Sequence, residues 1–187
     1  YCDDERRKAQ GLPRGVTRWQ GYDGAVNIQS YSGGRVRWVD LTNPGFRPAS
    51  DESFDWTMSL EVGEHIPAGP KSDAFVDNLV ANTVCGLVIS WGFPGQGGDG
   101  HVNLLTTEDV VAKFEARGLH YDKATSTAMR AAASYSWFHG TVEAGDQSWF
   151  DRLFHKRTEI RHPVTGELSP GSIMVFRSRS DHGGRCN

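Results

Sequence analysis

The segment Phe54-Asp55-Trp56-Thr57-Met58-Ser59-Leu60-Glu61-Val62-Gly63-Glu64-His65-Ile66-Pro67 decides how the rest of the chain is interpreted. A largely apolar run, 54–60, ends abruptly in two carboxylates, a glycine, a histidine and a proline. This pattern is typical of a buried strand that delivers polar groups to the edge of a sheet. Because ligands of open α/β sheets bind at the carboxyl ends of the strands, we expect Glu61, Glu64 and His65 to lie at a functional site.

The composition is that of one ordinary globular domain. The chain has 187 residues, of which 37% are hydrophobic and 23% charged, with a net charge of -3. This charge gives no electrostatic footprint for nucleic acid, and no apolar run approaches the ~18 residues that a membrane span needs. Without a signal-peptide pattern, we expect a cytoplasmic protein with no membrane span and no nucleic-acid partner; the oligomeric state stays open.

Cysteine usage points to the same compartment. The three cysteines are Cys2, Cys85 and Cys186, and an odd, sparse count argues against a disulfide framework and fits reducing conditions. Cys85 begins an apolar run, so we expect it to be a buried, inert thiol.

Strand and helix patterns alternate along most of the chain. Apolar residues at helical spacing follow Ser72, which we expect to cap a helix. Thr106 and Asp109 form a capping-box pattern before the next helix, and Asp122 precedes an Ala-rich one. We expect strands at 16–22, 35–41, 54–60, 86–91, 118–121 and 172–177. The alternation predicts an α/β, Rossmann-like fold, a mostly parallel doubly wound sheet with helices on both faces.

Three of the predicted strands end in acids, which are Asp23, Asp40 and Glu61. In doubly wound sheets an acid after an early strand binds ribose hydroxyls. An acid at a strand end is also a common turn former or helix cap. Both interpretations stay open for each of the three residues.

A glycine-rich loop follows the most apolar strand. Gly95, Gly97 and Gly100 satisfy the dinucleotide fingerprint G-x-G-x-x-G. That fingerprint needs its third glycine at the start of a helix, whereas residues 101–105 intervene before Thr106. We therefore expect a mobile loop over a binding crevice, with His101 and Asn103 facing a substrate.

A metal site is the next hypothesis, because His65 and His101 could join Glu61 and Glu64 as ligands. Their spacing matches no familiar zinc or iron signature. The sequence therefore predicts no metal site.

These motifs resemble those of class I S-adenosylmethionine-dependent methyltransferases. The run 59–67 is similar to their fourth motif, where a strand ends beneath the methyl donor. Segments 21–24 and 39–41 are similar to the second and third motifs, and 86–103 resembles the fifth strand and loop of one uncharacterised subgroup. The resemblance covers about 16–138, with the four motifs in the family's order.

The resemblance implies a cofactor and site roles. S-adenosyl-L-methionine would be the methyl donor, and a small molecule or another unidentified group would be the acceptor. Asp23 and Gly24 would hold the ribose, Asp40 and Leu41 the adenine, and Glu61 would lie below the donor. We expect His65 and His101 to be the catalytic residues, in acceptor contact or as a base. The expected substrate-binding residues are Glu64, Gln96 and Asn103.

The chain departs from the family in two places. The glycine-rich first motif has no counterpart in residues 1–22, which implies a fragment that starts after it. The family's antiparallel last pair of strands would use 118–121 and 172–177. We expect a truncated core at 1–143, an irregular excursion at 144–171, the last strand at 172–178 and a frayed tail at 179–187.

Two other functions stay open. An NAD(P)- or other nucleotide-binding α/β enzyme would use the Gly95–Gly100 loop. A degenerate methyltransferase fold without activity would serve as a binding module, and the missing first motif favours this for an incomplete fragment.

Overall fold

The computed structural model describes residues 8–11, 16, 18–48, 54–133, 141–143, 157–159, 171–179 and 186. These residues fall into two compact units, Tyr1–Leu41 and Thr42–Asn187. Each unit is described by itself.

The first unit holds a parallel pair of strands joined by a short helix. Strand β1 (Gly21–Asp23) pairs with β2 (Val36–Trp38), and α2 (Ile28–Tyr31) lies between them in the chain. The short helix between the two strands was not predicted, since only a turn was expected there, at 31–34. Both strands are shorter than predicted. Val16 and residues 18–20 lie outside β1, and β2 covers only three residues of the predicted strand 35–41.

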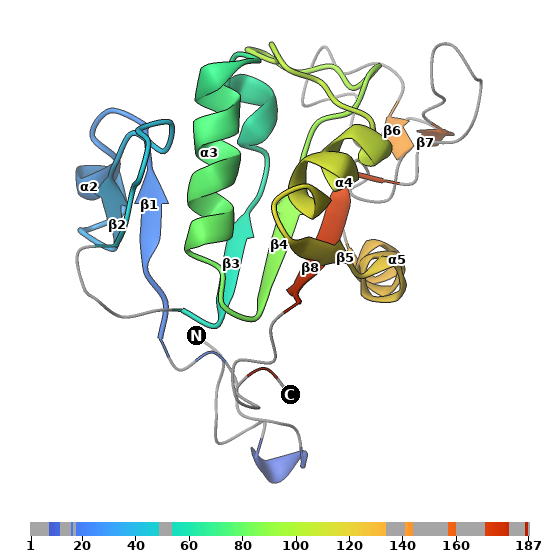
Figure 1. The fold of residues 1–187 in the computed structure, drawn as a ribbon, viewed down its shortest axis with the longest axis horizontal. Coiled ribbons are helices and arrows are strands. Elements are labelled where there is room, and N and C mark those ends of the chain that lie inside the picture. Colours follow the sequence, from blue (N-terminus) through green and yellow to red (C-terminus); the bar gives the residue numbers. More distant parts are fainter. Residues whose placement is uncertain are drawn as a thin grey trace. The chain divides into compact units, whose positions relative to one another are not determined.

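The second unit is built on a four-stranded mixed sheet. Its order is β3 (Trp56–Ser59), β4 (Gly86–Ser90), β8 (Ile173–Ser178) and β5 (Leu119–Tyr121), as Figure 1 shows. Strands β3 and β4 are parallel, and β8 is antiparallel to both β4 and β5. The predicted antiparallel pairing of the last two strands is therefore confirmed, with β8 inserted between β4 and β5.

Two helices cover one face of this sheet. In β4, Leu87 pairs with Phe176 of β8, so both side chains point to the same face. Helix α4 (Thr107–Glu115) packs Phe114 on that face, 5.0 Å from the Phe176 ring. Helix α3 (Pro70–Ala81) packs Phe75 6.2 Å from Trp91, which follows β4. These residues are at most 1% exposed and form a dry core.

The exposure of strand β3 contradicts the expectation of a buried strand at 54–60. Trp56 is 42% exposed, Met58 70% and Leu60 36%, and only Ser59 of the strand is buried. In the described sheet β3 is an outer strand, so its side chains on the face opposite α3 and α4 have few neighbours.

The start of α3 also differs from expectation. The helix begins at Pro70, after Gly69, and not at Ser72. A proline fits the first helical turn because its missing N–H has no partner there in any helix. Ser72 is instead fully buried inside the helix, where its hydroxyl accepts a hydrogen bond from Asn103.

The two other predicted helix starts are confirmed. The Thr106 side chain accepts from the backbone N of Asp109, and the Asp109 side chain accepts in return, which completes the capping box. Asp122 caps α5 (Lys123–Ala132) by accepting from Thr125 N at 2.9 Å.

Helix α5 completes the hydrogen bonding of β8 where β5 ends. The pairing of β5 stops at Tyr121, opposite Phe176. Beyond that point Val175 N donates to Ser126 Oγ at 2.9 Å, and Asp122 N donates to Val175 O at 2.8 Å. A buried backbone N–H without a partner is costly. The Ser126 hydroxyl therefore accepts the hydrogen bond that a neighbouring strand would otherwise accept.

The segment predicted to be irregular contains a strand. Strand β7 (Arg157–Glu159) pairs antiparallel with β6 (Thr141–Glu143), so the irregular assignment of 144–171 is wrong for 157–159. In that segment, residues 144–156 and 160–170 lie outside the described residues.

A disulfide joins Cys85 to Cys186, so the prediction of a free Cys85 thiol is wrong. Ser178 N at the end of β8 donates to Cys85 O at 2.9 Å. Cys186 is therefore tied to the body rather than part of a frayed tail, and the cysteine argument for a reducing compartment loses its basis.

Among the described residues, every helix is too short or too polar to cross a bilayer.

Candidate functional site

Glu61 stands just past the carboxyl end of β3 and is fixed by β4. Its backbone N donates to Ser90 Oγ at 2.8 Å, and that hydroxyl donates to Glu61 Oε1 at 2.6 Å. Gln96 Nε2 donates to Oε2 at 3.2 Å. The backbone of Glu61 has φ 54°, a left-handed conformation that costs about 1–3 kcal/mol outside glycine. Such strain is typical of functional sites, where the surrounding contacts hold it in place.

The next turn, η1 (Gly63–His65), buries a carboxyl group. Glu64 is fully buried, and neither of its carboxyl oxygens has a hydrogen-bond partner in the described part of the chain. Burial raises the pKa of Glu64 to about 7, and both the negative charge and the side-chain proximity of Glu61 act in the same direction. The nearby backbone N–H groups of Glu64 and Gly92 only partly oppose this.

The loop 92–105 folds back onto η1. Val102 N and Asn103 N both donate to Glu64 O, at 2.9 and 3.0 Å. This pairing brings His101 beside His65, with ring centroids 4.9 Å apart and ring planes at 69°. His65 Nδ1 also lies 3.2 Å from Gly100 O.

Trp91 contacts both the turn η1 and the loop 92–105. Its indole N–H donates to Asn103 O at 2.7 Å, and its ring lies against Gly63. A Cβ on Gly63 would fall 2.3 Å from the ring, so only glycine fits. Sequence reasoning did not assign a role to Gly63, Ser90 or Trp91, although the glycine between the two acids was a visible signal.

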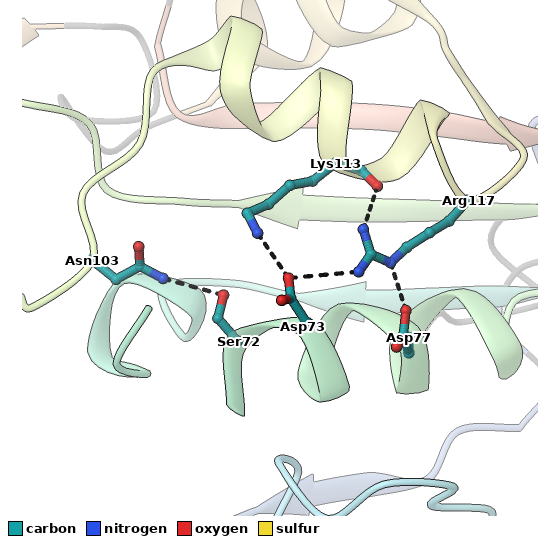
Figure 2. Close-up of polar contacts among 6 residues, drawn as sticks. All are labelled: Ser72, Asp73, Asp77, Asn103, Lys113 and Arg117. Carbon is teal, nitrogen blue, oxygen red and sulfur yellow. Dashed lines mark hydrogen bonds and ion pairs between the residues drawn. The ribbon is translucent and has the colours of Figure 1, made fainter. Parts of the chain in front are cut away.

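Two predicted substrate-binding residues use their side chains to fix the loop 92–105, and neither side chain lies on an open surface. Gln96 is buried. Its Nε2 donates to Glu61, and its Oε1 accepts from Phe93 N at 3.3 Å. Buried Asn103 donates from Nδ2 to Ser72 Oγ at 3.2 Å, as Figure 2 shows. Both side chains therefore have structural partners, and their contact with a substrate stays a prediction.

Ion pairs join α3 to Lys113 of α4 and to Arg117, which lies just after α4. Lys113 Nζ lies 3.1 Å from Asp73 Oδ1, and Arg117 pairs with Asp73 at 3.6 Å and with Asp77 (Figure 2). Because the loop 92–105 runs into α4 and its Asn103 contacts α3, these pairs stabilise the frame on which the site is built.

The geometry of the glycine loop agrees with the rejection of the dinucleotide fingerprint. Gly95 and Gly100 adopt positive φ, of 95° and 75°. Helix α4 begins only at Thr107. The third glycine is thus not at a helix start, as the fingerprint requires.

The residues expected to hold the donor's nucleoside divide between the two units. In the first unit, Asp23 ends β1 and accepts from Ala25 N at 2.7 Å, the turn-forming role. Asp40 and Leu41 follow β2, the parallel partner of β1, so both acids lie at strand carboxyl ends. Gly24 O accepts from Trp38 Nε1 at 3.1 Å. Glu61 belongs to the second unit.

The tertiary structure gathers three potential metal ligands. Glu64, His65 and His101 each offer one ligand atom, and these atoms lie within 4.8 Å of one another. In the sequence these three residues, together with Glu61, are candidate metal ligands, but no site was predicted because their spacing matches no familiar signature.

The chain matches no protein-family model and no curated protein sequence. It is similar to solved structures of magnesium protoporphyrin IX methyltransferase from Synechocystis PCC 6803. The structure with bound SAM has a TM-score of 0.43 and 13% identity, covering 85% of this chain and 58% of that chain. The structure with bound SAH has a TM-score of 0.40 and 13% identity, covering 81% and 55%. A third, the [4+2]-cyclase SpnF, has a TM-score of 0.42 and 14% identity, covering 65% and 49%. The chain thus spans less than two thirds of the length of each of these proteins, and they include S-adenosylmethionine-dependent methyltransferases.

Proposed function

We propose that this chain is part of an S-adenosylmethionine-dependent methyltransferase of class I, with a doubly wound Rossmann-like core. The observation that carries the proposal is the position of the run 59–67. It leaves β3 at the carboxyl edge of the sheet and turns polar groups toward the loop after β4. The antiparallel β5–β8 pair, which the family resemblance predicts, adds support.

The residue roles proposed here are those that the family resemblance implies. Asp23 and Gly24 bind the ribose hydroxyls of the donor, Asp40 and Leu41 its adenine, and Glu61 lies below the donor. The sulfonium of the donor already carries a good leaving group, so the protein contributes mainly orientation of the two reactants. The methyl group passes to an O, N or C nucleophile of a small-molecule or other acceptor in contact with Glu64, Gln96 and Asn103.

His65 and His101 are the groups proposed to meet the acceptor. Both rings lie at the surface of the site, with His65 exposed and His101 partly buried. An imidazole accepts a proton near neutral pH, which suits the removal of a proton from a hydroxyl or amine as the methyl group arrives.

Calorimetric titration with S-adenosylhomocysteine tests the proposal. We expect the chain to bind one equivalent, and Asp23→Asn to weaken binding because the ribose loses a charged acceptor. The exposed helix residue Glu108 provides the matched control, and Glu108→Gln should bind as the wild type does. Absence of binding both by this chain and by a version extended upstream with a glycine-rich first motif would contradict the proposal. Retention on a nicotinamide-nucleotide column would instead support the dinucleotide alternative.

A further inference from the structure

We propose that Glu64, His65 and His101 form a binding site for one divalent first-row transition-metal ion, such as Zn²⁺. Their three ligand atoms lie within 4.8 Å of one another. Ligands of one tetrahedral Zn²⁺ are about 3.4 Å apart, so binding would draw the three side chains closer together. This inference departs from the expectation of no metal, because the cluster exists only once the loop 92–105 has folded onto η1.

Unpartnered polar atoms point to a ligand in this cluster. Glu64 is fully buried with both carboxyl oxygens unpaired, and Nδ1 of His101 is also buried without a partner among the described residues. Buried polar groups in native proteins normally have partners, and exceptions call for an unseen water or ion. One cation would give all three of these atoms a partner.

The imidazole of His65 is also oriented for metal binding. Gly100 O lies 3.2 Å from His65 Nδ1, and a carbonyl can only accept, so the ring proton is on Nδ1. Nε2 therefore carries the free lone pair. Metal-binding histidines typically donate their other ring N–H to a backbone carbonyl or carboxylate, which fixes the tautomer.

The donor set selects the class of ion. One carboxylate and two imidazoles suit Zn²⁺ or Fe²⁺, whereas Mg²⁺ and Ca²⁺ prefer oxygen ligands alone. The carboxylate of Glu61 adds a second negative charge nearby, oriented by Ser90 and Gln96. Within the described residues neither Glu61 nor Glu64 forms an ion pair with a lysine or arginine. A bound cation would therefore offset the negative charge of the two carboxyl groups.

The metal site and the proposed methyl transfer can be tested separately. If the ion binds, the two imidazoles are its ligands, and this replaces the base role proposed for them above. Three protein ligands would leave a position open for an oxygen or nitrogen of the acceptor. Metal binding needs no methyl donor, so it can hold even if S-adenosylhomocysteine fails to bind.

The experiment is a calorimetric titration of the chelator-stripped full chain with Zn²⁺, with Mg²⁺ as the second titrant. We expect one Zn²⁺ per chain and no comparable Mg²⁺ binding. His101→Ala and Glu64→Gln should each weaken Zn²⁺ binding at least about tenfold, since even outer-shell changes cost 10–100-fold. The exposed His120, which pairs with Glu115 at 3.7 Å, is the matched control, and His120→Ala should leave binding unchanged.

A second measurement excludes misfolding as the cause of lost binding. Far-UV circular dichroism of both variants should match the wild type, and Zn²⁺ should raise the melting temperature of the wild type and of His120→Ala only. Co²⁺ absorption bands should report mixed nitrogen and oxygen ligation in the same two proteins. Absence of stoichiometric Zn²⁺ binding, or equal binding by folded His101→Ala, would overturn the proposal.

Discussion

At the scale of single residues, one glycine determines whether the site can form. Gly63 lies against the ring of Trp91, which is 1% exposed and bonded through its N–H to Asn103 O. Neither partner can move without disturbing the loop. The two acids around Gly63 therefore keep their positions only while residue 63 has no side chain.

We expect Gly63→Ala to destabilise the chain by about 1–3 kcal/mol, the usual cost of overpacking a filled core. Urea unfolding followed by tryptophan fluorescence measures this change. Gly97→Ala in the neighbouring loop is the control, since its Cβ would meet nothing within 4 Å. Equal midpoints for the two variants would show that Trp91 yields to the added methyl group.

Glu61 also shows how little of a side chain's setting is visible in sequence. Its position after a strand was predictable, but its left-handed backbone and its bonds to Ser90 and Gln96 were not. Those partners are 29 and 35 residues away along the chain, and no local pattern links them.

At the scale of elements, the helix starts are the best-predicted features. The capping box of α4 and the Asp122 cap of α5 involve side chains three residues apart, so short-range chemistry is sufficient to form them. The start of α3 was misplaced because Ser72 has two uses. It resembles a cap in sequence, but tertiary contact with Asn103 buries it inside the helix.

The Asp122 cap predicts a pH dependence. Hydrogen bonds from Thr125, and then the charge of Arg177, hold the pKa of Asp122 below its usual value. The folded state therefore binds fewer protons than the unfolded state. The stabilisation is present above the unfolded pKa near 3.8 and is lost as pH falls through the lower folded value.

Asp122→Asn keeps an N-cap acceptor but removes the charge. We expect it to lower the free energy of unfolding at pH 7, with the difference from wild type shrinking as pH falls below about 4. Urea unfolding across this pH range measures the difference. A gap that stays constant down to pH 2.5 would contradict the assignment.

At the scale of the whole molecule, the Cys85–Cys186 disulfide joins residues 101 positions apart. A crosslink over so long a loop restricts the unfolded chain strongly, which on the loop-entropy account stabilises the fold by about 2–5 kcal/mol. It ties Cys186 to Cys85, the residue that directly precedes β4.

We expect Cys186→Ser to lower the melting temperature by several degrees, while Cys2→Ser, which leaves the pair intact, should not. Differential scanning calorimetry of non-reduced protein measures both. Thiol labelling provides a further check, since wild type should expose one free thiol per unfolded chain. Three labelled thiols would contradict the disulfide.

The sequence by itself determined the alternation of strands and helices, the caps of α4 and α5, and the polar run that ends β3. Each depends on residues close together in the chain, where spacing and side-chain chemistry decide the local structure. The antiparallel β5–β8 pair was also foreseen, but through the family resemblance and not through local pattern.

Only the tertiary structure decided the exposure of β3, the Cys85–Cys186 pairing and the clustering of His101 with Glu64 and His65. Each of these depends on contacts across long stretches of chain: the order of strands in the sheet, the register of β8, and the two hydrogen bonds from the loop to Glu64 O. Such contacts form because distant segments share one core, and sequence spacing carries no record of that.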